Sequence, residues 1–497
     1  MMFSNSWQSM DDACRAYGVG RRTFMKSGMA FAGMAGAGFN VFGDTVKPPD
    51  LRVGLLADTH LRLPPSTFGT QKLEAAFRRF DAEKVDAVLV AGDLTDFGLI
   101  PELRIFADTW YKVFPDDRRS DGTHVEKLFI YGDHDTGRYI HERINETLKG
   151  YPHDKEEINK LVIPFGDRGQ IWKDFFHEDW APVMKKTVKG YDFVLVHHAQ
   201  GEPDNLWGSR APALKPFYDA YTPDQSRPFF HVQHRVCSKT AYVPGHANCD
   251  DGESTRVLSR FPNCFAFCGH AHTFFNNDRS LWQGAYTLLE IPSLSYICVF
   301  TGRENAGSTK AQREAGYVPQ MDTFPFWLSR QGMIADIYGD RIVLSRIDLE
   351  APPGSVFGPD WTVPLPLGKE KPFEFSALEA RVPVPQFPPD AKLQVKSGKG
   401  KNRKKEKVDQ VTVTFPTILA SSTGPRVFDY EVAATGDGGE KVVKRVYSEK
   451  FWRAECMEPK LSKCVFACSE LPKGKIVFSV RPANSFGKAG KAIECRM

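Results

Sequence analysis

Short hydrophobic runs followed at once by polar residues dominate the first two thirds of the chain. Residues 51–57 and 85–91 are almost continuously hydrophobic, which is typical of strands in a sheet that is covered on both faces. Runs at 191–196 and 228–234 are similar, and the segment 213–221 between them has the pattern of a helix. We therefore expect an α/β domain in which polar side chains emerge at the rim of a sheet, where such folds place their sites.

A predicted hairpin and a proline-rich segment follow this region. Residues 332–338 and 341–347 have the pattern of two strands joined through Gly339 and Asp340. Prolines are frequent from 350 to 390. Because proline lacks an N–H group and clashes inside helices, we expect a stiff linker there that contains neither a helix nor a central strand.

The last part of the chain, residues 391–497, has the pattern of a small all-β sandwich. Alternating segments at 411–415, 427–432 and 476–480 are separated by turns rich in Gly, Pro and Asn. Its final segments resemble the last strands of a fibronectin type III domain: Leu471–Gly474, Phe478–Val480 and Pro482–Gly487. Such a module implies binding, spacing or bracing, and we expect no chemistry from it.

Five polar runs in the predicted α/β region combine aspartate and histidine. They are Asp58-Thr59-His60, Gly92-Asp93, Gly132-Asp133-His134-Asp135, the histidines of 228–234, and Gly269-His270-Ala271-His272. Any one of them arises readily by chance, but the ordered set favours a metal site. Carboxylate and imidazole ligands together suit Mn, Fe, Zn or Co rather than Ca or Mg, and their even mix predicts two ions that share a carboxylate. Two such ions, about 3.5–4 Å apart, hold a phosphoryl group and ionise a shared water.

The order of these runs is similar to that of the calcineurin-like metallophosphoesterases, and residues 50–349 are identified as a member of that family by this resemblance. The resemblance implies a four-layer αββα sandwich, followed here by the small all-β sandwich. It also implies hydrolysis of phosphomonoester or phosphodiester bonds by a hydroxide that bridges two divalent or trivalent ions, Mn, Fe or Zn. A phosphate ester is therefore the expected substrate.

The same resemblance implies a role for each residue of the runs. Asp58, His60 and His272 would bind the first ion, Asp93 would bridge both ions, and Asp133, His234 and His270 would complete the second site. His134 would be a catalytic residue near the leaving oxygen, and Asp135 would orient it. We expect Asp96 to hydrogen-bond a ligand or to cap the next helix.

Two positions leave alternatives open. The family has Asn where this chain has Asp133, so a second ion meets an extra negative charge that holds the cation more tightly and disfavours a phosphate. A weakly active or inactive binding or scaffold protein at the cell surface, and an enzyme with one functional ion, therefore remain as alternatives. In the fourth run His234 follows a Pro-plus-apolar strand and is preferred, with His197 or His198 as the alternative ligand.

The amino-terminal segment, residues 1–37, resembles a twin-arginine export signal. Arg21, Arg22 and Lys26 precede a Gly- and Ala-rich apolar stretch. This stretch is too short and too rich in glycine for a membrane span, which needs about 20 apolar residues, and small residues favour cleavage close to Ala37. We expect a periplasmic or secreted protein that keeps no transmembrane span after the signal is removed.

Composition agrees with a globular protein and narrows the partners. Hydrophobic residues make up 41% and charged residues 25% of 497 positions, and the formal net charge is +4. Nothing in these values demands a nucleic-acid partner, and we find no nucleic-acid-binding motif. The basic run 396–407 is expected to be a solvated loop, with contact to a polyanionic surface as the alternative. Cys264 and Cys268 are expected to be small core residues.

Overall fold

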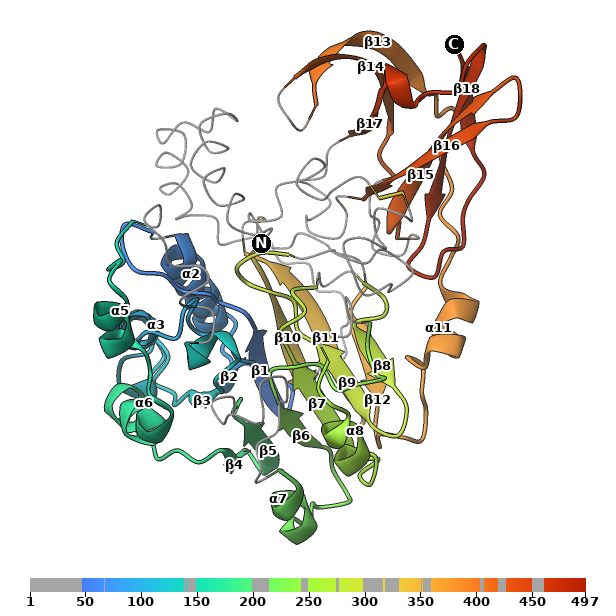
Figure 1. The fold of residues 1–497 in the computed structure, drawn as a ribbon. Coiled ribbons are helices and arrows are strands. Elements are labelled where there is room, and N and C mark those ends of the chain that lie inside the picture. The colour runs from blue at the N-terminus through green and yellow to red at the C-terminus, as the bar shows by residue number, and fades with distance from the viewer. Residues whose placement is uncertain are drawn as a thin grey trace, which may run out of the picture.

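The fold is described here from a computed structural model of the chain (Figure 1). The residues that the structure describes are 47–66, 68–137, 140, 149–198, 214–242, 249–273, 277–297, 316–317, 330–349, 351, 359–402, 406–418, 426–448 and 460–497. The predicted export signal, residues 1–37, lies outside this part of the chain, as do Arg403, Lys404 and Lys405 of the basic run.

The first sheet has six strands in the order β12-β11-β10-β1-β2-β3. Strands β1, β2 and β3 run parallel, because Val53 pairs with Ala87 and Ala87 in turn pairs with Glu126. The predicted hairpin is confirmed as the antiparallel pair β10 and β11. The strands are β1 (Leu51–Leu56), β2 (Ala87–Val90), β3 (Glu126–Phe129), β10 (Gln331–Ile337), β11 (Arg341–Asp348) and β12 (Trp361–Pro364).

The second sheet also has six strands, in the order β4-β5-β6-β7-β9-β8. Its central strands β5, β6, β7 and β9 are parallel to one another. The predicted strands at 191–196 and 228–234 are confirmed as β5 and β6, and both are buried along most of their length. The strands are β4 (Val183–Val188), β5 (Tyr191–Val196), β6 (Phe229–Val232), β7 (Cys264–Cys268), β8 (Leu281–Gln283) and β9 (Thr287–Glu290).

Helices cover the outer face of each sheet. Helices α2, α3 and α6 share a core with the first sheet, in which Phe77, Phe106 and Trp110 are fully buried. The predicted helix at 213–221 is confirmed as α7, and it packs with α8 on the second sheet. The helices are α2 (Phe68–Ala82), α3 (Ile100–Val113), α5 (Lys155–Leu161), α6 (Arg168–Phe176), α7 (Leu214–Ala220), α8 (Glu253–Leu258) and α11 (Phe375–Arg381), with short 3-10 turns η1 (Pro115–Asp117), η2 (His134–Thr136), η3 (Phe165–Asp167) and η8 (Cys468–Glu470).

The largest core lies between the two sheets. Leu55 and Leu89 from the first sheet pack against Phe230 and Phe267 from the second, and all four side chains are excluded from solvent. The order of layers is therefore helix, sheet, sheet, helix, so the predicted αββα sandwich is confirmed (Figure 1). Cys264 and Cys268 are buried free thiols in the core of the second sheet, as predicted.

The proline-rich segment contains a helix, contrary to the prediction. Helix α11 occupies 375–381, a stretch without proline between Pro372 and Pro383, so the prolines limit the helix without preventing it. Strand β12 adds to the edge of the first sheet beside β11, with Pro364 as its last residue. An edge position suits proline, because no further strand needs its missing N–H group.

Two small sheets form the last part of the chain, one of three strands (β13-β14-β17) and one of four (β16-β15-β18-β19). Val413, Phe415, Tyr430, Phe466 and Phe478 are buried in the core they share. This arrangement confirms an all-β sandwich. The strands are β13 (Gln394–Lys401), β14 (Lys407–Pro416), β15 (Asp429–Gly436), β16 (Lys441–Tyr447), β17 (Leu461–Ala467), β18 (Ile476–Ala483) and β19 (Ile493–Arg496).

The basic run is partly a strand and not the predicted loop. Lys396, Lys399 and Lys401 belong to β13, which pairs with β14 at the edge of the three-stranded sheet. All three side chains are exposed. Lysines on an edge strand oppose pairing with a second molecule. This structural role explains the basic run without a ligand.

Buried polar contacts fasten the sandwich to the α/β domain. Asp278 accepts hydrogen bonds from Arg426 (3.0 Å) and from the Ser485 hydroxyl (2.9 Å), both on the sandwich side. Tyr317 donates its hydroxyl to Asp429 at 2.6 Å. These side chains have less than a tenth of their residue surface exposed, so the joint excludes water and fixes the two parts together.

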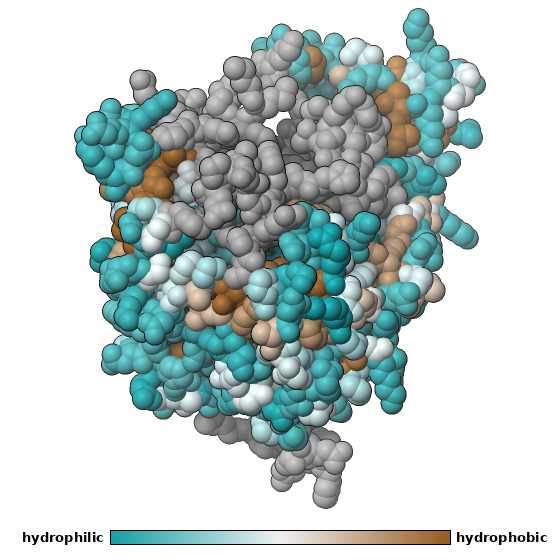
Figure 2. Space-filling model, turned by 60° about the horizontal axis from the view of Figure 1, so that its bottom comes forward, coloured by the Kyte–Doolittle hydropathy of each residue, from teal (hydrophilic) through white to brown (hydrophobic). Residues whose placement is uncertain are grey.

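Few large hydrophobic side chains of the described residues are exposed. On the face that Figure 2 views, the described residues are mainly hydrophilic and the hydrophobic ones occupy small separate areas. Large exposed hydrophobic side chains of the described residues all lie after 380: Val384, Leu461, Val465 and Met497. Within the described part of the chain, no helix is both long enough and apolar enough to span a membrane.

A buried carboxyl group shapes the loop that follows β2. Glu102, in the first turn of α3, accepts hydrogen bonds from the backbone N–H groups of Phe97 (3.0 Å) and Leu99 (3.4 Å) and from the Tyr151 hydroxyl (2.7 Å). Burial raises the pKa of Glu102 to about 8. The folded protein therefore holds a proton on this group that the unfolded chain releases at lower pH.

The raised pKa of Glu102 predicts how the stability of the protein depends on pH. Because the folded-state pKa is raised, the contribution of Glu102 to stability is complete below its unfolded value of about 4.3 and is lost as the pH rises through about 8. Glu102→Gln is neutral at every pH, so we expect the variant to gain stability relative to the parent between about pH 5 and about pH 9. Urea unfolding across that range measures the difference, with the exposed Glu494→Gln as control. A difference that does not change with pH contradicts the assignment.

Candidate metal centre

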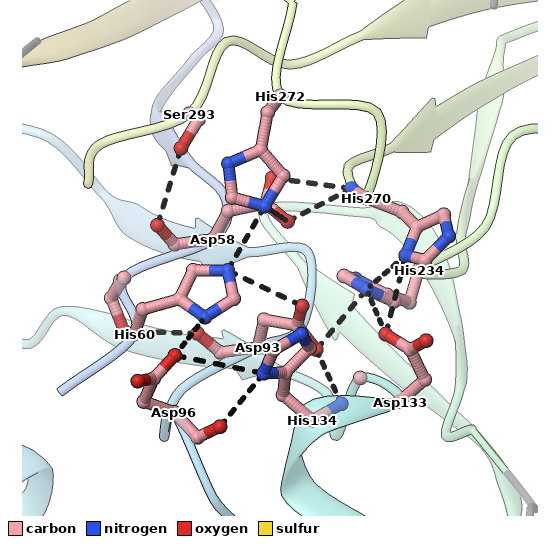
Figure 3. Close-up of polar contacts among 12 residues, drawn as sticks. Asp58, His60, Asp93, Asp96, Asp133, His134, His234, His270, His272 and Ser293 are labelled. Atoms are coloured by element: carbon pink, nitrogen blue, oxygen red, sulfur yellow. Dashed lines mark hydrogen bonds and ion pairs between the residues drawn. The ribbon is translucent and has the colours of Figure 1, made fainter. Parts of the chain in front are cut away.

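The predicted ligands all lie at the carboxyl ends of parallel strands. Because β1, β2 and β3 are parallel in one sheet and β6 and β7 in the other, their last residues meet at one edge of the sandwich. The ligands come directly after these strands: Asp58 and His60 after β1, Asp93 after β2, Asp133 after β3, His234 after β6, and His270 and His272 after β7 (Figure 3).

The structure brings the seven residues together in two groups that share one member. In each group, one ligand atom from every residue lies within 4.8 Å of the others. Asp93 belongs to both groups, as a bridging ligand does, and all residues except the half-buried His270 are buried. The first group is Asp58, His60, Asp93 and His272, and the second is Asp93, Asp133, His234 and His270.

The two histidines of the first group face each other with bare nitrogens. His272 Nδ1 lies 2.8 Å from the carbonyl oxygen of Tyr296, which only accepts, so this nitrogen carries the proton. His60 Nδ1 lies 3.0 Å from a carboxylate oxygen of Asp96, and the same reasoning applies. Burial lowers the pKa of both imidazoles, so both rings are neutral. Their unprotonated Nε2 atoms then point at each other across 3.0 Å, which is repulsive unless a cation lies beside both.

The second group has a similar arrangement around His234. Its Nδ1 donates to the carbonyl oxygen of Ala91 at 2.7 Å, and its Nε2 lies 3.1 Å from Asp93 Oδ1, 3.2 Å from Asp133 Oδ1 and 3.1 Å from His270 Nδ1. Burial alone lowers the pKa of His234, but Asp93 and Asp133 raise it well above its usual value. A positive charge is therefore required here, and either a proton or a metal ion can supply it.

One carboxylate oxygen of Asp93 is evidence for a bound metal ion. Asp93 Oδ2 is buried and accepts no hydrogen bond from any residue in the described ranges. A buried carboxylate oxygen without a donor is costly, and coordination of a cation removes that cost. The mixture of carboxylate oxygens and imidazole nitrogens fits Mn, Fe or Zn.

The backbone is strained where it presents these ligands. Asp58, His60, Asp93, His270 and His272 have φ between 45° and 71°, the left-handed region that costs a non-glycine residue about 1–3 kcal/mol. Such strain is concentrated at functional sites, because the surrounding fold must hold it in place.

Glycines before two of the ligands allow the loops to approach closely. A Cβ atom at Gly92 would lie 2.5 Å from His234 Nδ1, and one at Gly132 would lie 2.2 Å from Asp93 Oδ1. Real Cβ atoms essentially never come so near another heavy atom. The Gly-Asp pairs of the sequence are therefore explained by the space that the facing ligand needs.

Part of the chain that contains this site matches a known protein family. Residues 51–274 match the family described as Calcineurin-like phosphoesterase (Metallophos). The chain contains a calcineurin-like phosphoesterase domain. No curated protein matches the chain.

Two solved structures are similar to the chain at low identity. A dimetal phosphatase from Danio rerio is 12% identical, with 64% of this chain and 99% of that chain covered and a TM-score of 0.33. A conserved uncharacterized protein from Streptococcus pneumoniae, described as a predicted phosphoesterase, is 10% identical, with 63% and 97% covered and a TM-score of 0.26. At these TM-scores neither structure bears on the substrate of this chain.

The predicted role of Asp135 in the phosphoesterase domain is wrong. Its two carboxylate oxygens accept hydrogen bonds from the backbone N–H groups of Leu94, Thr95 and Gly132 and from the Thr95 hydroxyl. Burial raises the pKa of Asp135 to about 6. Its side chain therefore ties the loops after β2 and β3 together, and it does not orient His134.

Asp96 performs the orienting role instead. The ring of His134 donates through Nδ1 to the carbonyl oxygen of Asp96 at 2.7 Å, while the Asp96 carboxylate holds His60 (Figure 3). Burial favours a raised pKa for Asp96, but Arg62, whose Nε lies 2.6 Å away, and His60 lower it below its usual range. The first of the two roles predicted for Asp96 is therefore confirmed, since it hydrogen-bonds a predicted ligand.

The alternative ligands of the fourth run lie apart from the two groups. His197 accepts the Tyr131 N–H at 3.1 Å and packs against Trp172, with ring centroids 4.9 Å apart. Burial lowers the pKa of His197 to about 3. The ring of His198 is 6.5 Å from that of His234, and neither residue belongs to a metal-ligand group of the described residues.

Three residues near the predicted ligands could not be identified from the sequence patterns. Tyr296 stacks on His272, with ring centroids 4.0 Å apart, Arg62 holds Asp96, and Arg235 Nη2 lies 3.4 Å from Asp133 Oδ2. Arg62 and Arg235 follow predicted ligands closely in the sequence, which is the only signal that pointed to them. No pattern marked Tyr296.

These contacts predict how metal content responds to substitution. Because His234 faces Asp93 and Asp133 while His197 lies in the core, we expect His234→Ala to reduce bound Mn²⁺ from about two ions per chain to about one, and His197→Asn to keep both. Elemental analysis of the reconstituted, folded proteins measures the content. Equal losses in the two variants, with circular dichroism unchanged, contradict the assignment of His234.

Proposed function

We propose that this protein is a metal-dependent phosphoesterase that hydrolyses phosphomonoester or phosphodiester bonds with the help of two ions, Mn, Fe or Zn. The observation that carries the proposal is the set of buried imidazole nitrogens and carboxylate oxygens that converge around Asp93 in two groups. The match of residues 51–274 to the calcineurin-like phosphoesterases supports the reaction class. When bound, such a pair of ions lowers the pKa of a shared water and polarises the phosphoryl oxygens.

The chain's own residues position the ligands and handle the leaving group. Asp96 fixes the ring of His60 through its carboxylate and the ring of His134 through its carbonyl oxygen. Because Nδ1 of His134 is engaged by that carbonyl, Nε2 is the atom through which this ring reaches the substrate. We assign it the hydrogen bond or proton that the leaving oxygen needs.

We also propose that residues 1–37 direct twin-arginine export, so that the mature protein is periplasmic or secreted. The paired arginines before a mild apolar stretch support this proposal. Export of a folded protein suits a site whose ligands come from two sheets, because the metal must be loaded after both sheets have formed.

The C-terminal sandwich is proposed to be a fibronectin type III-like module that braces the phosphoesterase domain. Its division into sheets of three and four strands and its buried joint around Asp278 support this role. The exposed lysines of β13 make contact with a surface polyanion a further proposal, beside their protection of a sheet edge.

Turnover of two model esters tests the proposed reaction. We expect the chain without residues 1–37, supplied with Mn²⁺, to hydrolyse p-nitrophenyl phosphate or bis-p-nitrophenyl phosphate. Asp93→Asn should lower kcat/KM by at least about 100-fold, because loss of even an outer-shell partner of a metal site costs about 10–100-fold. The preferred ester distinguishes a monoesterase from a diesterase.

An exposed aspartate in the linker, Asp390→Asn, is the matched control and should retain parental activity. If the parent binds Mn²⁺ but hydrolyses neither ester, the metal-binding scaffold becomes the better description. If Asp93→Asn keeps parental turnover, Asp93 does not bridge the ions and the two-ion reaction is wrong.

A further inference from the structure

Arg235 lies where the second ligand group carries its additional carboxylate. We propose that Arg235 is a positioning residue that offsets the negative charge of Asp133, so that this group holds an exchangeable metal ion and still accepts a phosphate. The inference rests on the proposed function, because it concerns the charge that the same site presents to its ion and to a phosphate.

The carboxylate of Asp133 is divided between the ligand group and the arginine. Asp133 Oδ1 lies 3.2 Å from His234 Nε2 and 3.2 Å from His270 Nδ1, on the side where the ligand atoms converge. Asp133 Oδ2 faces Arg235 Nη2 at 3.4 Å. One oxygen is thus placed to bind an ion while the other interacts with a fixed cation.

Burial makes this pair matter electrostatically. The side chain of Arg235 is 3% exposed and that of Asp133 is fully buried. Charges in such a place are screened weakly by water and salt, so each strongly affects a charge placed nearby. An unpaired carboxylate here would bind a cation tightly and repel a phosphate, and an unpaired guanidinium would repel the cation.

The fold also holds the arginine in place. Arg235 directly follows His234, so both residues lie in the loop after β6. His234 faces the carboxylates of Asp93 and Asp133, and Arg235 compensates the charge of Asp133. The Gln233 side chain donates to the carbonyl oxygen of Arg235 at 2.6 Å, and it also reaches Asp250. This fixed backbone directs the guanidinium towards Asp133 without a cost in side-chain reorganisation when an ion binds.

The net charge of the second group explains how Asp133 and Arg235 together affect binding. The two groups contain three carboxylates, Asp58, Asp93 and Asp133. With Arg235 beside Asp133, the second group presents to its ion about the net charge that an asparagine at 133 would present without the arginine. Asp133 and Arg235 therefore form a matched pair, and changing one alone should alter ion and phosphate affinity in opposite directions.

A double-mutant cycle on metal binding tests the proposal without any substrate. Mn²⁺ binding to the metal-free chain is measured by calorimetry for the parent, Asp133→Asn, Arg235→Gln and the double variant. We expect Asp133→Asn to weaken the second Mn²⁺ by about 10–100-fold, because the arginine then faces the ion without its carboxylate. Arg235→Gln should bind the second Mn²⁺ more tightly than the parent, and the double variant should return to within about threefold of it.

Inorganic phosphate provides the second readout. We expect inorganic phosphate to bind the Mn²⁺-loaded Arg235→Gln variant more weakly than the Mn²⁺-loaded parent. Arg235→Lys restores the positive charge and should recover the phosphate affinity. A structural pair would lower the melting temperature of the metal-free variants without moving Mn²⁺ and phosphate affinities in opposite directions. Arg235→Lys also covers the case in which the glutamine variant fails to fold.

The outcomes separate this inference from the proposed function. A double variant that binds the second Mn²⁺ as weakly as Asp133→Asn, an Arg235→Gln variant that binds it no more tightly than the parent, or no change of phosphate affinity in Arg235→Gln overturns the charge-offset role even if the parent hydrolyses esters. If the variants show the expected compensation but the parent hydrolyses neither model ester, the phosphoesterase reaction is overturned and the pairing of Asp133 with Arg235 is established.

Discussion

Repulsion between like groups at the meeting edge of the two sheets is the constraint on which the rest of this structure depends. Neutral imidazoles point lone pairs at each other, and buried carboxylates lie around Asp93 with one oxygen that has no donor among the described residues. A cation relieves each of these costs at once. The strained backbone at five of the ligands and the glycines before Asp93 and Asp133 make sense only as the means of holding this arrangement.

The ligands could be predicted because each directly follows a hydrophobic strand. A run such as 51–57 fixes both the strand and the position of Asp58 at its end, so the sequence contains the element and the site together. The partners of the ligands could not be predicted in this way. Asp96 orients His134 in place of Asp135, because the hydrogen bonds of both aspartates join loops that are about 40 residues apart in sequence, and local patterns do not determine such contacts.

The errors outside the site have a similar origin. Prolines on both sides of 375–381 were taken as excluding a helix, although they only set its limits. The lysines of 396–401 were expected in a loop because charge alone indicates exposure, whereas pairing with β14 decides that the backbone is extended. In both cases a composition signal was correct about the environment of the side chains and wrong about the path of the backbone.

The joint around Asp278 has a consequence for the independence of the two parts of the chain. Asp278 lies six residues after His272, and its charge is buried against Arg426 and Ser485 of the sandwich. Loss of the sandwich would leave that carboxylate without its partners close to a metal-ligand loop. The sandwich is thus not a freely exchangeable module on a tether, because the α/β domain contains a buried charge whose hydrogen-bond partners the sandwich supplies.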